Sequence, residues 1–231
     1  MTIFKSSQIA PKALSFSQAT SLPPTLYHLT QVQNWPSIEQ HGLLSTQALL
    51  DLAELSDEER ERVGNQHRAQ RVVLPNGVVI SDQKPMPPTA LARCLHGVTP
   101  EQWYALLNSK VFFWPHVERL HRLRRVYKAQ PQVLMVIDTE RLLARYSERI
   151  TLTAINTGNA RRQPAKRGLS TFVPYETWFV SGWASETEAL HTRPRLRSHP
   201  PAELTVTYAV PDVMDFVVDV QHLGPQETLH H

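Results

Sequence analysis

The chain has 231 residues, of which 41% are hydrophobic and 19% are charged, and its formal net charge is +3. This composition is typical of a globular protein that can bury a core, and it excludes a fibrous or disordered chain. Apolar runs such as 133–137 are much shorter than the roughly 20 residues of a membrane-spanning helix, and Cys94 is the only cysteine. The N-terminus lacks the basic and apolar regions of a secretory signal, so we expect a cytoplasmic protein with no membrane partner.

The eleven histidines include no HExxH or similarly spaced pair, so no metal site is expected. We expect an N-terminal arm over residues 1–24, one domain over residues 25–223, and a C-terminal tail over residues 224–231. The tail ends in His230 and His231, which are typical of a purification-tag remnant.

The hydrophobic pattern and the turn residues predict the elements of the first half of the chain. These are a strand at 26–29, helices at 36–41 and 46–55, a helix that runs from a Ser56 cap toward Arg71, and a hairpin of 72–74 and 78–80 around Asn76-Gly77. The proline-rich segment 85–88 is expected to break the chain.

The same signals predict the second half. The elements are a helix from a Thr99 cap to about Leu107, an aromatic strand at 111–114, a basic helix at 116–127, a strand at 133–138, a helix at 140–146, a strand at 150–155, a turn at 156–159, an extended segment at 171–173, a turn or short helix at 175–178, and strands at 204–208 and 216–220.

Strands and helices follow one another without a regular strand-helix-strand rhythm, and neither GxGxxG nor GxxxxGK[ST] occurs in the chain. This argues against Rossmann and P-loop folds. We expect an α+β single domain with a split or curved, mainly antiparallel sheet.

The segment from Tyr27 to Leu44 contains the most informative motif. Alternate strand residues point the same way, so His28 and Thr30 share one face of the first strand and could hold a dinucleotide. Asn34 is suited to cap the helix that follows, and Gly42 to its left-handed exit.

This order of strand, polar pair, capped helix and glycine exit resembles the opening of the ADP-ribosyltransferases, in particular the DarT-like enzymes that modify nucleic acid. The resemblance implies an ADP-ribosyltransferase-like fold and NAD as co-substrate, held by His28, Thr30, Asn34 and Gly42. For Asn34, capping of the helix alone is the alternative. The resemblance further implies transfer of ADP-ribose to an acceptor such as a DNA or RNA base, and a toxin–antitoxin setting with a hydrolase or inhibitor as partner.

The segment 198–206 resembles the DarT-like segment in which Gln-Ala-Glu begins a strand and the glutamate is catalytic, which places the catalytic carboxylate at Glu203. A carboxylate near the ribose would stabilise the positive charge that develops as nicotinamide leaves. Pro201 stands where the DarT-like pattern has glutamine, so any contact made by that glutamine is absent or supplied elsewhere. Glu186 and Glu188 are the alternative carboxylates.

The resemblance places Arg71, just before the hairpin, in the catalytic site and Arg68, one helical turn earlier, among the NAD-binding residues. An arginine normally stays protonated, so phosphate or ribose binding is favoured over proton abstraction for Arg71. The resemblance also places an aromatic residue under the nicotinamide, from a strand comparable to 111–114. Phe113, which points away from Phe112 and Trp114, is our choice, and Tyr27 is the other aromatic near the expected pocket. Packing in the core is the alternative for Phe113.

Basic runs over residues 119–128, 161–167 and 193–197 could neutralise nucleic-acid phosphates, or could be ordinary solvated surface. The segments 156–162 and 167–172 could form a loop pair that binds phosphate or acceptor, and Asp82 could order an arginine or close a turn. Three functions remain open: an ADP-ribosyltransferase, a non-catalytic module that binds NAD or nucleic acid, and an NAD hydrolase.

Overall fold

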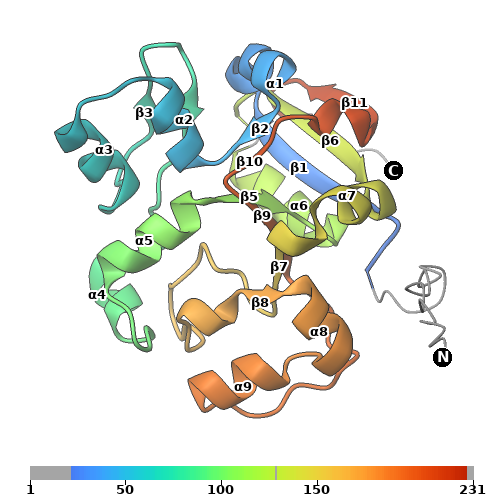
Figure 1. The fold of residues 1–231 in the computed structure, drawn as a ribbon. Helices are drawn as coiled ribbons and strands as arrows, with labels where there is room; N and C mark the ends of the chain where they lie inside the picture. Colours follow the sequence, from blue (N-terminus) through green and yellow to red (C-terminus); the bar gives the residue numbers. More distant parts are fainter. Residues whose placement is uncertain (1–21, 128, 228–231) are drawn as a thin grey trace, which may run out of the picture.

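The computed structural model describes residues 22–127 and 129–227, and it combines helices with several small antiparallel sheets (Figure 1). Most of the expected N-terminal arm, the last four residues with His230 and His231, and Lys128 of the basic run 119–128 lie outside the described residues. The expectation of a mainly antiparallel α+β fold is confirmed in this form. In the described part of the chain, no helix has the length and apolar character needed to cross a membrane.

The helices are α1 (Trp35–His41), α2 (Thr46–Leu52), α3 (Asp57–Gly64), α4 (Pro88–Ala92), α5 (Pro100–Asn108), α6 (Val117–Val126), α7 (Thr139–Tyr146), α8 (Tyr175–Ser181) and α9 (Ala184–Leu190). The strands are β1 (Thr25–Gln31), β2 (Leu43–Leu44), β3 (Val72–Val73), β4 (Val79–Ile80), β5 (Lys110–Phe113), β6 (Gln132–Asp138), β7 (Ile150–Thr153), β8 (Val173–Pro174), β9 (Glu203–Thr207), β10 (Ala209–Val210) and β11 (Val217–Leu223).

The first sheet has the order β1-β6-β11, with β6 in the middle. Because side chains alternate across a strand, Val133 and Met135 of β6 pack in the main core with α7, while Leu134 packs on the other face against α6. The sheet is therefore covered on both faces.

The second sheet has the order β5-β9-β7-β8 and is joined to the first at one point. Tyr27 of β1 and Trp114, which follows β5, exchange two backbone hydrogen bonds of 3.0 and 2.8 Å. One residue further on, the Phe112 carbonyl accepts a hydrogen bond from the His28 ring instead of from the backbone. The two sheets therefore part between β1 and β5, as a split sheet requires.

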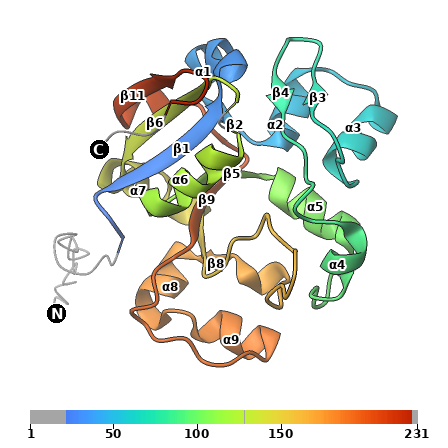
Figure 2. The same cartoon turned by 180° about the vertical axis from the view of Figure 1, so that it is seen from behind.

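Two smaller groups of elements flank the sheets. Helices α2 and α3 pack with the β3–β4 hairpin around their own small core, which contains Leu50, Val63 and Leu74. Figure 2 shows this group beside α5 and β5, with α8 and α9 at the opposite end of the molecule. Residues 65–71 join α3 to β3 within this group, and residues 81–87 lead from β4 to α4.

Most predicted elements are confirmed, because their signals are local. Ser56 and Thr99 each form a capping box at the start of a helix, and Gly77, at φ +83°, turns the β3–β4 hairpin. Helix α3, however, ends at Gly64 and does not run toward Arg71, so the helical spacing expected between Arg68 and Arg71 is wrong. Beyond the end of the helix, the Arg68 backbone N–H donates to the Gln83 side chain at 3.0 Å and not to a helical carbonyl.

Other elements were not predicted. Strands β2 and β10 have two residues each and exist only because they pair with each other. Helix α4 begins at Pro88, where a proline is tolerated in the first turn, and α9 was not predicted at all. The segment 171–173 is not one extended piece, since a 3₁₀ turn over Leu169–Thr171 precedes β8.

Candidate functional site

Two adjoining hollows lie where the sheets part. The first has a cavity volume of about 350 Å³ and is lined by His28, Thr30 and Asn34, among others. The second has a volume of about 870 Å³, within the range usual for ligand sites, and reaches Glu203. The two hollows share six lining residues, which are Thr46, Arg68, Lys110, Phe112, Leu123 and Tyr127. One extended ligand could therefore occupy both.

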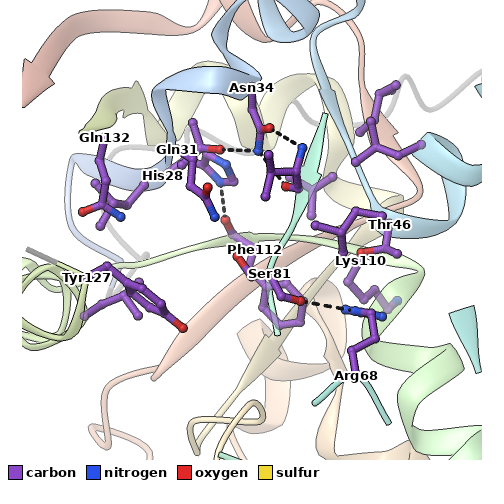
Figure 3. Close-up of a pocket in the computed structure, with 18 residues that line it drawn as sticks. His28, Gln31, Asn34, Thr46, Arg68, Ser81, Lys110, Phe112, Tyr127 and Gln132 are labelled. Atoms are coloured by element: carbon purple, nitrogen blue, oxygen red, sulfur yellow. Dashed lines mark hydrogen bonds between the residues drawn. The ribbon is translucent and has the colours of Figure 1, made fainter. Parts of the chain in front are cut away.

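His28 lies in the first hollow, with its ring bonded to the Phe112 carbonyl (Figure 3). Its Nδ1 is 2.8 Å from the Phe112 carbonyl oxygen, and since a carbonyl only accepts, Nδ1 carries the hydrogen. Burial lowers the pKa of His28, although the bond to Phe112 acts in the opposite direction. The ring is therefore neutral near pH 7, and its Nε2 is a hydrogen-bond acceptor.

Asn34 directly precedes α1 but does not cap it with its side chain. Its amide instead accepts from the Val79 N–H at 2.8 Å and donates to the Val79 carbonyl at 3.0 Å and to the Thr30 hydroxyl at 3.2 Å. The capping role expected of the Asn34 side chain is thus corrected: it ties β4 to the β1 wall of the first hollow.

We predict that Asn34→Ala lowers the free energy of unfolding by about 1–3 kcal/mol, because the buried Val79 N–H and carbonyl both lose their partner. Chemical denaturation monitored by circular dichroism measures the change. Gln33→Ala, at the exposed neighbouring position, is the matched control and should be nearly neutral. Equal stability of the two variants would contradict the role assigned to Asn34.

Glu203 is the first residue of β9 and is only 2% exposed, yet it lines the second hollow. Its Oε2 accepts from the Thr157 hydroxyl at 2.8 Å and the Thr153 hydroxyl at 3.0 Å, and both carboxylate oxygens lie 3.2–3.3 Å from the Thr157 N–H. Burial raises the pKa of Glu203 to about 7, while these bonds and the charge of Arg119 oppose the rise. The carboxyl group is oriented and close to its titration midpoint at neutral pH.

The two alternative carboxylates lie elsewhere. Glu186 is fully buried in α9 and forms an ion pair of 3.2 Å with Arg195, and Glu188 is exposed on the same helix. Neither lines the two hollows formed by the described residues. Of the three candidate carboxylates, Glu203 is the one that lines the second hollow.

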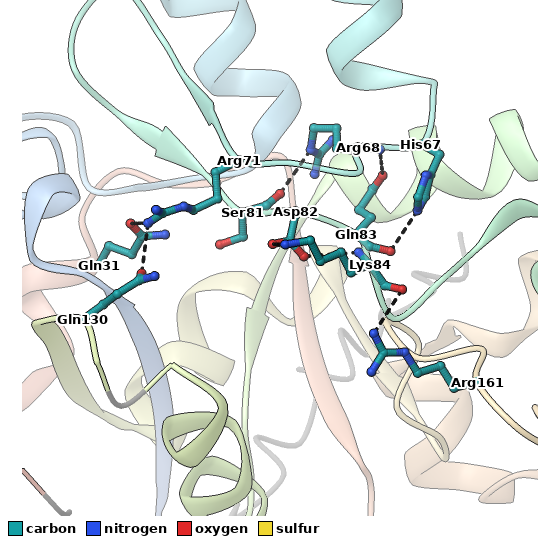
Figure 4. Close-up of polar contacts among 10 residues, drawn as sticks. All are labelled: Gln31, His67, Arg68, Arg71, Ser81, Asp82, Gln83, Lys84, Gln130 and Arg161. Carbon is teal, nitrogen blue, oxygen red and sulfur yellow. Dashed lines mark hydrogen bonds and ion pairs between the residues drawn. The ribbon is translucent and has the colours of Figure 1, made fainter. Parts of the chain in front are cut away.

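Arg68 and Arg71 both line the second hollow but differ in their partners (Figure 4). Arg68 is buried, and its guanidinium donates to the Val63 carbonyl at 2.5 Å, the Ser81 carbonyl at 3.2 Å and Asn108 Oδ1 at 3.1 Å. Burial lowers its pKa to about 10, so the group remains charged at neutral pH.

Arg71 is exposed and makes weaker contacts. Its Nη1 donates to Gln130 Oε1 at 3.1 Å and to Gln31 Oε1 at 3.4 Å. These neutral partners leave its charge uncompensated at the rim of the hollow. Asp82 closes a turn by accepting from the Lys84 N–H at 3.2 Å, and its charge also acts on Arg68.

The two faces of strand β5 differ: one packs in the core and the other lines the hollows. Phe113, the aromatic residue expected under the nicotinamide, lies on the core face. Phe113 is fully buried in the main core, with its ring centroid 5.9 Å from that of His28. Phe112 lines both hollows, and Trp114 lines the second. The aromatic wall of the site is therefore formed by Phe112 and Trp114.

Gly42 does not line either hollow formed by the described residues. It ends α1 at φ +71°, and a Cβ atom there would lie 2.4 Å from the carbonyl oxygens of Val210 and Pro211. Only glycine fits this turn, which sets the path from α1 into β2.

Sequence reasoning missed Lys110, on the wall that both hollows share. Its Nζ donates to the Thr207 hydroxyl at 2.8 Å, and burial lowers its pKa. The alternation of Lys110, Phe112 and Trp114 along β5 is a signal that could have found it.

Positive charge surrounds the second hollow. The lysines and arginines among its lining residues are Arg68, Arg71, Lys84, Lys110, Arg119, Arg122 and Arg161, against the two carboxylates Asp82 and Glu203. Of the loop pair considered above, the segment 156–161 contributes to the lining, whereas Arg167 is buried behind it. Such a cavity suits a ligand with several negative charges. Within the described residues, no group of three or more His, Cys, Asp or Glu side chains could hold a metal ion.

A model of a family of unknown function (DUF7002) matches residues 24–217. The chain belongs to the DUF7002 family. The match begins just before β1 and ends as β11 begins, so it includes every residue discussed above as lining the two hollows. No curated protein matches this DUF7002 chain.

A solved structure, "Thermosipho africanus DarTG in complex with ADP-ribose", is similar to this DUF7002 member at 14% sequence identity and a TM-score of 0.38. The match covers 87% of this chain and 44% of that chain, so the DUF7002 member spans less than half of the length of the solved protein.

Proposed function

We propose that this DUF7002 protein is an ADP-ribosyltransferase that takes NAD as co-substrate. One observation carries the proposal: His28 with Thr30, and the buried carboxylate of Glu203, line two hollows that are joined along a common wall. The order of these residues in the chain agrees with the DarT-like pattern, and the cations around the second hollow suit the diphosphate of a dinucleotide.

The chemistry follows from the nature of the groups. The bond between the ribose C1′ and the nicotinamide nitrogen breaks, and its electron pair leaves with nicotinamide. The acceptor then forms a bond to C1′ and gives up a proton. The positive charge that develops on the ribose is stabilised by an ionised Glu203, whose side chain is itself buried.

The other residues bind and orient the co-substrate in this proposal. His28 Nε2 accepts a hydrogen bond from a ribose hydroxyl or an amide, and Thr30 supplies a hydroxyl beside it. Arg71 contacts phosphate or ribose at the rim, Arg68 adds a fixed positive charge to the wall, and Phe112 stacks on the nicotinamide ring.

The acceptor we propose is a base in DNA or RNA. Arg71, Arg122 and Arg161 are exposed at the second hollow, where they could contact phosphates on either side of a base. Following the resemblance to DarT-like enzymes, we further propose that the protein acts as a toxin, with a hydrolase or inhibitor as its antitoxin partner.

The test is an incubation with NAD that carries a label in its adenylate phosphate. Nicotinamide release and label transfer are followed separately with single-stranded DNA, RNA, a protein lysate and no acceptor. We expect release that depends on nucleic acid and transfer of label to it. Release that is indifferent to every acceptor would identify an NAD hydrolase instead.

The same protein should be titrated with NAD by calorimetry at two salt concentrations. Binding of NAD or nucleic acid without any nicotinamide release would identify a non-catalytic binding module. Neither binding nor release, in a protein shown to be folded, would refute the proposed function.

A further inference from the structure

Arg167 carries a buried positive charge behind the second hollow. Its side chain is 2% exposed and donates to two backbone carbonyls, from Nη1 to Thr157 at 3.1 Å and from Nε to Ala165 at 3.1 Å. No carboxylate forms an ion pair with it in the part of the chain that the structure describes. Burial of a guanidinium costs free energy that neutral carbonyls offset only in part. A charge at this position therefore calls for a role beyond packing.

The guanidinium is rigidly held. The backbone of Arg167 is fixed by two hydrogen bonds: the Arg167 backbone N–H donates to the Cys94 carbonyl at 2.8 Å, and the Arg167 carbonyl accepts from the His96 backbone N–H at 2.8 Å. The guanidinium also lies 5.9 Å from the centroid of the Trp103 ring. Gly168 permits this close approach, since a Cβ atom there would lie 2.4 Å from the His96 carbonyl oxygen. Arg167 is thus fixed to the segment that follows α4.

Thr157 connects this fixed charge to the proposed catalytic carboxylate. Its carbonyl accepts from Arg167, while its hydroxyl and N–H both donate to Glu203. Thr157 lies in a turn after β7. Without the bond from Arg167 to its carbonyl, this turn would hold the Thr157 hydroxyl and N–H less firmly against Glu203. Loss of the guanidinium should therefore disturb Glu203 by geometry and by charge together.

We infer that Arg167 is a positioning residue, which holds Thr157 against Glu203 and thereby orients the carboxylate and favours its ionised form. The inference rests on the proposed function for its catalytic meaning, but its effect on Glu203 can be measured without NAD. Other titratable groups act on the same region. The Cys94 thiol and Glu203 both raise the pKa of Arg167, against the effect of burial, and Arg119 from α6 lowers the pKa of Glu203. Lys110 and Arg161 line the same hollow, and the Asp82–Lys84 pair lies on its wall. The test must therefore separate the effect of Arg167 on Glu203 from the effects of these other groups.

The first experiment measures ionisation of Glu203 through stability. The free energy of unfolding is determined from pH 5 to pH 9 for wild type, Arg167→Gln, Arg167→Lys and the exposed control Lys166→Gln, each with and without Glu203→Gln. The difference within each pair reports Glu203 alone. We expect Arg167→Gln to raise its midpoint by about one pH unit, since an opposite charge nearby has been removed. Arg167→Lys should keep the midpoint closer to wild type, and Lys166→Gln should leave it unchanged. An unchanged midpoint in Arg167→Gln would overturn the inference.

If Arg167→Gln does not fold, Thr157→Val tests the same connection. This variant keeps the guanidinium in place and removes one of the donors to Glu203, so it should also raise the midpoint. A midpoint equal to that of wild type would show that Thr157 does not transmit the effect, and it would overturn the inference in that case.

The second experiment uses NAD at pH 6 and pH 8. For Arg167→Gln we expect kcat for nicotinamide release to fall about tenfold at pH 6 but only about twofold at pH 8, with KM for NAD little changed. Arg167→Lys should recover most of the loss. A parallel fall at both pH values, not restored by lysine, would indicate a merely structural role. A raised stability midpoint in a protein that cleaves no NAD would refute the proposed function but not the link between Arg167 and Glu203.

Discussion

Replacement of Glu203 by glutamine is expected to lower the rate of nicotinamide release by about 10²–10³-fold, with NAD affinity changed only slightly. Glutamine has nearly the same shape and can still accept from Thr157 and Thr153, so the hollow should keep its geometry. What is lost is the negative charge, which in the proposed mechanism acts only as the ribose becomes positive. The measurement is single-turnover nicotinamide release, with NAD binding measured separately by calorimetry.

Glu188→Gln is the matched control for this substitution, because Glu188 is exposed on α9 and does not line the hollows. It should retain the wild-type rate. Full activity in Glu203→Gln, or equal losses in the two variants, would contradict the assignment of Glu203. In the wild type, the rate should also rise with pH to a plateau above about pH 7, since the ionised carboxylate is required and its pKa is about 7.

The local part of the fold could be predicted from the sequence, because its signals lie within a few residues of one another. The capping boxes at Ser56 and Thr99 and the Asn76-Gly77 turn fix helix starts and a hairpin without reference to distant residues. Strands β2 and β10 could not be predicted in this way, because each contains two residues and is defined only by its partner. The path of the chain after α3 likewise involves a distant residue, because the Arg68 N–H donates to Gln83, which lies 15 positions further along the chain.

In the candidate site, too, the features set by local pattern could be predicted and those set by distant residues could not. Alternation along β1 correctly placed His28 and Thr30 on one face, and both line the first hollow. Along β5, alternation separates Phe113 from Phe112 but does not say which of the two faces the core, and the choice of Phe113 therefore fell on the core side. That decision depends on how β5 pairs with β9, where Phe113 lies opposite Leu204.

The environment of Glu203 was even less accessible to sequence reasoning. The resemblance to DarT-like enzymes identified the glutamate, but its three donor groups come from Thr153 and Thr157, which lie about fifty positions earlier. Arg167 was predicted as part of a basic run and of the loop segment 167–172, with solvent, phosphate or acceptor contacts. Its burial is a consequence of the bridge between Leu95 and Arg167, which joins two segments that no local pattern connects.

A carboxyl group held in this environment should also make the protein less stable as pH rises, and this is the second large effect that we predict. In the folded protein, burial raises the pKa of Glu203 from its usual value of 4.5 to about 7. Between these two values the folded state retains a proton that the unfolded state has released. The free energy of unfolding therefore falls as pH increases, by about 1.4 kcal/mol for each pH unit and about 3 kcal/mol in total once pH exceeds 7.

Glu203→Gln removes this contribution, so the variant should become more stable than wild type by about 3 kcal/mol as pH rises from 4.5 to 8, relative to their difference at pH 4.5. Urea denaturation at a series of pH values measures the difference. His28 contributes a change of opposite sign, because burial lowers its pKa and stability is lost as pH falls below its usual 6.5, but this change is common to both proteins and cancels in the comparison. Parallel curves of unfolding free energy against pH for the two proteins would contradict the prediction, because they would show that folding does not raise the pKa of Glu203. A divergence above pH 5, together with loss of NAD cleavage in the variant, would mean that the fold gives up stability to keep a charge in the site where the proposed reaction needs it.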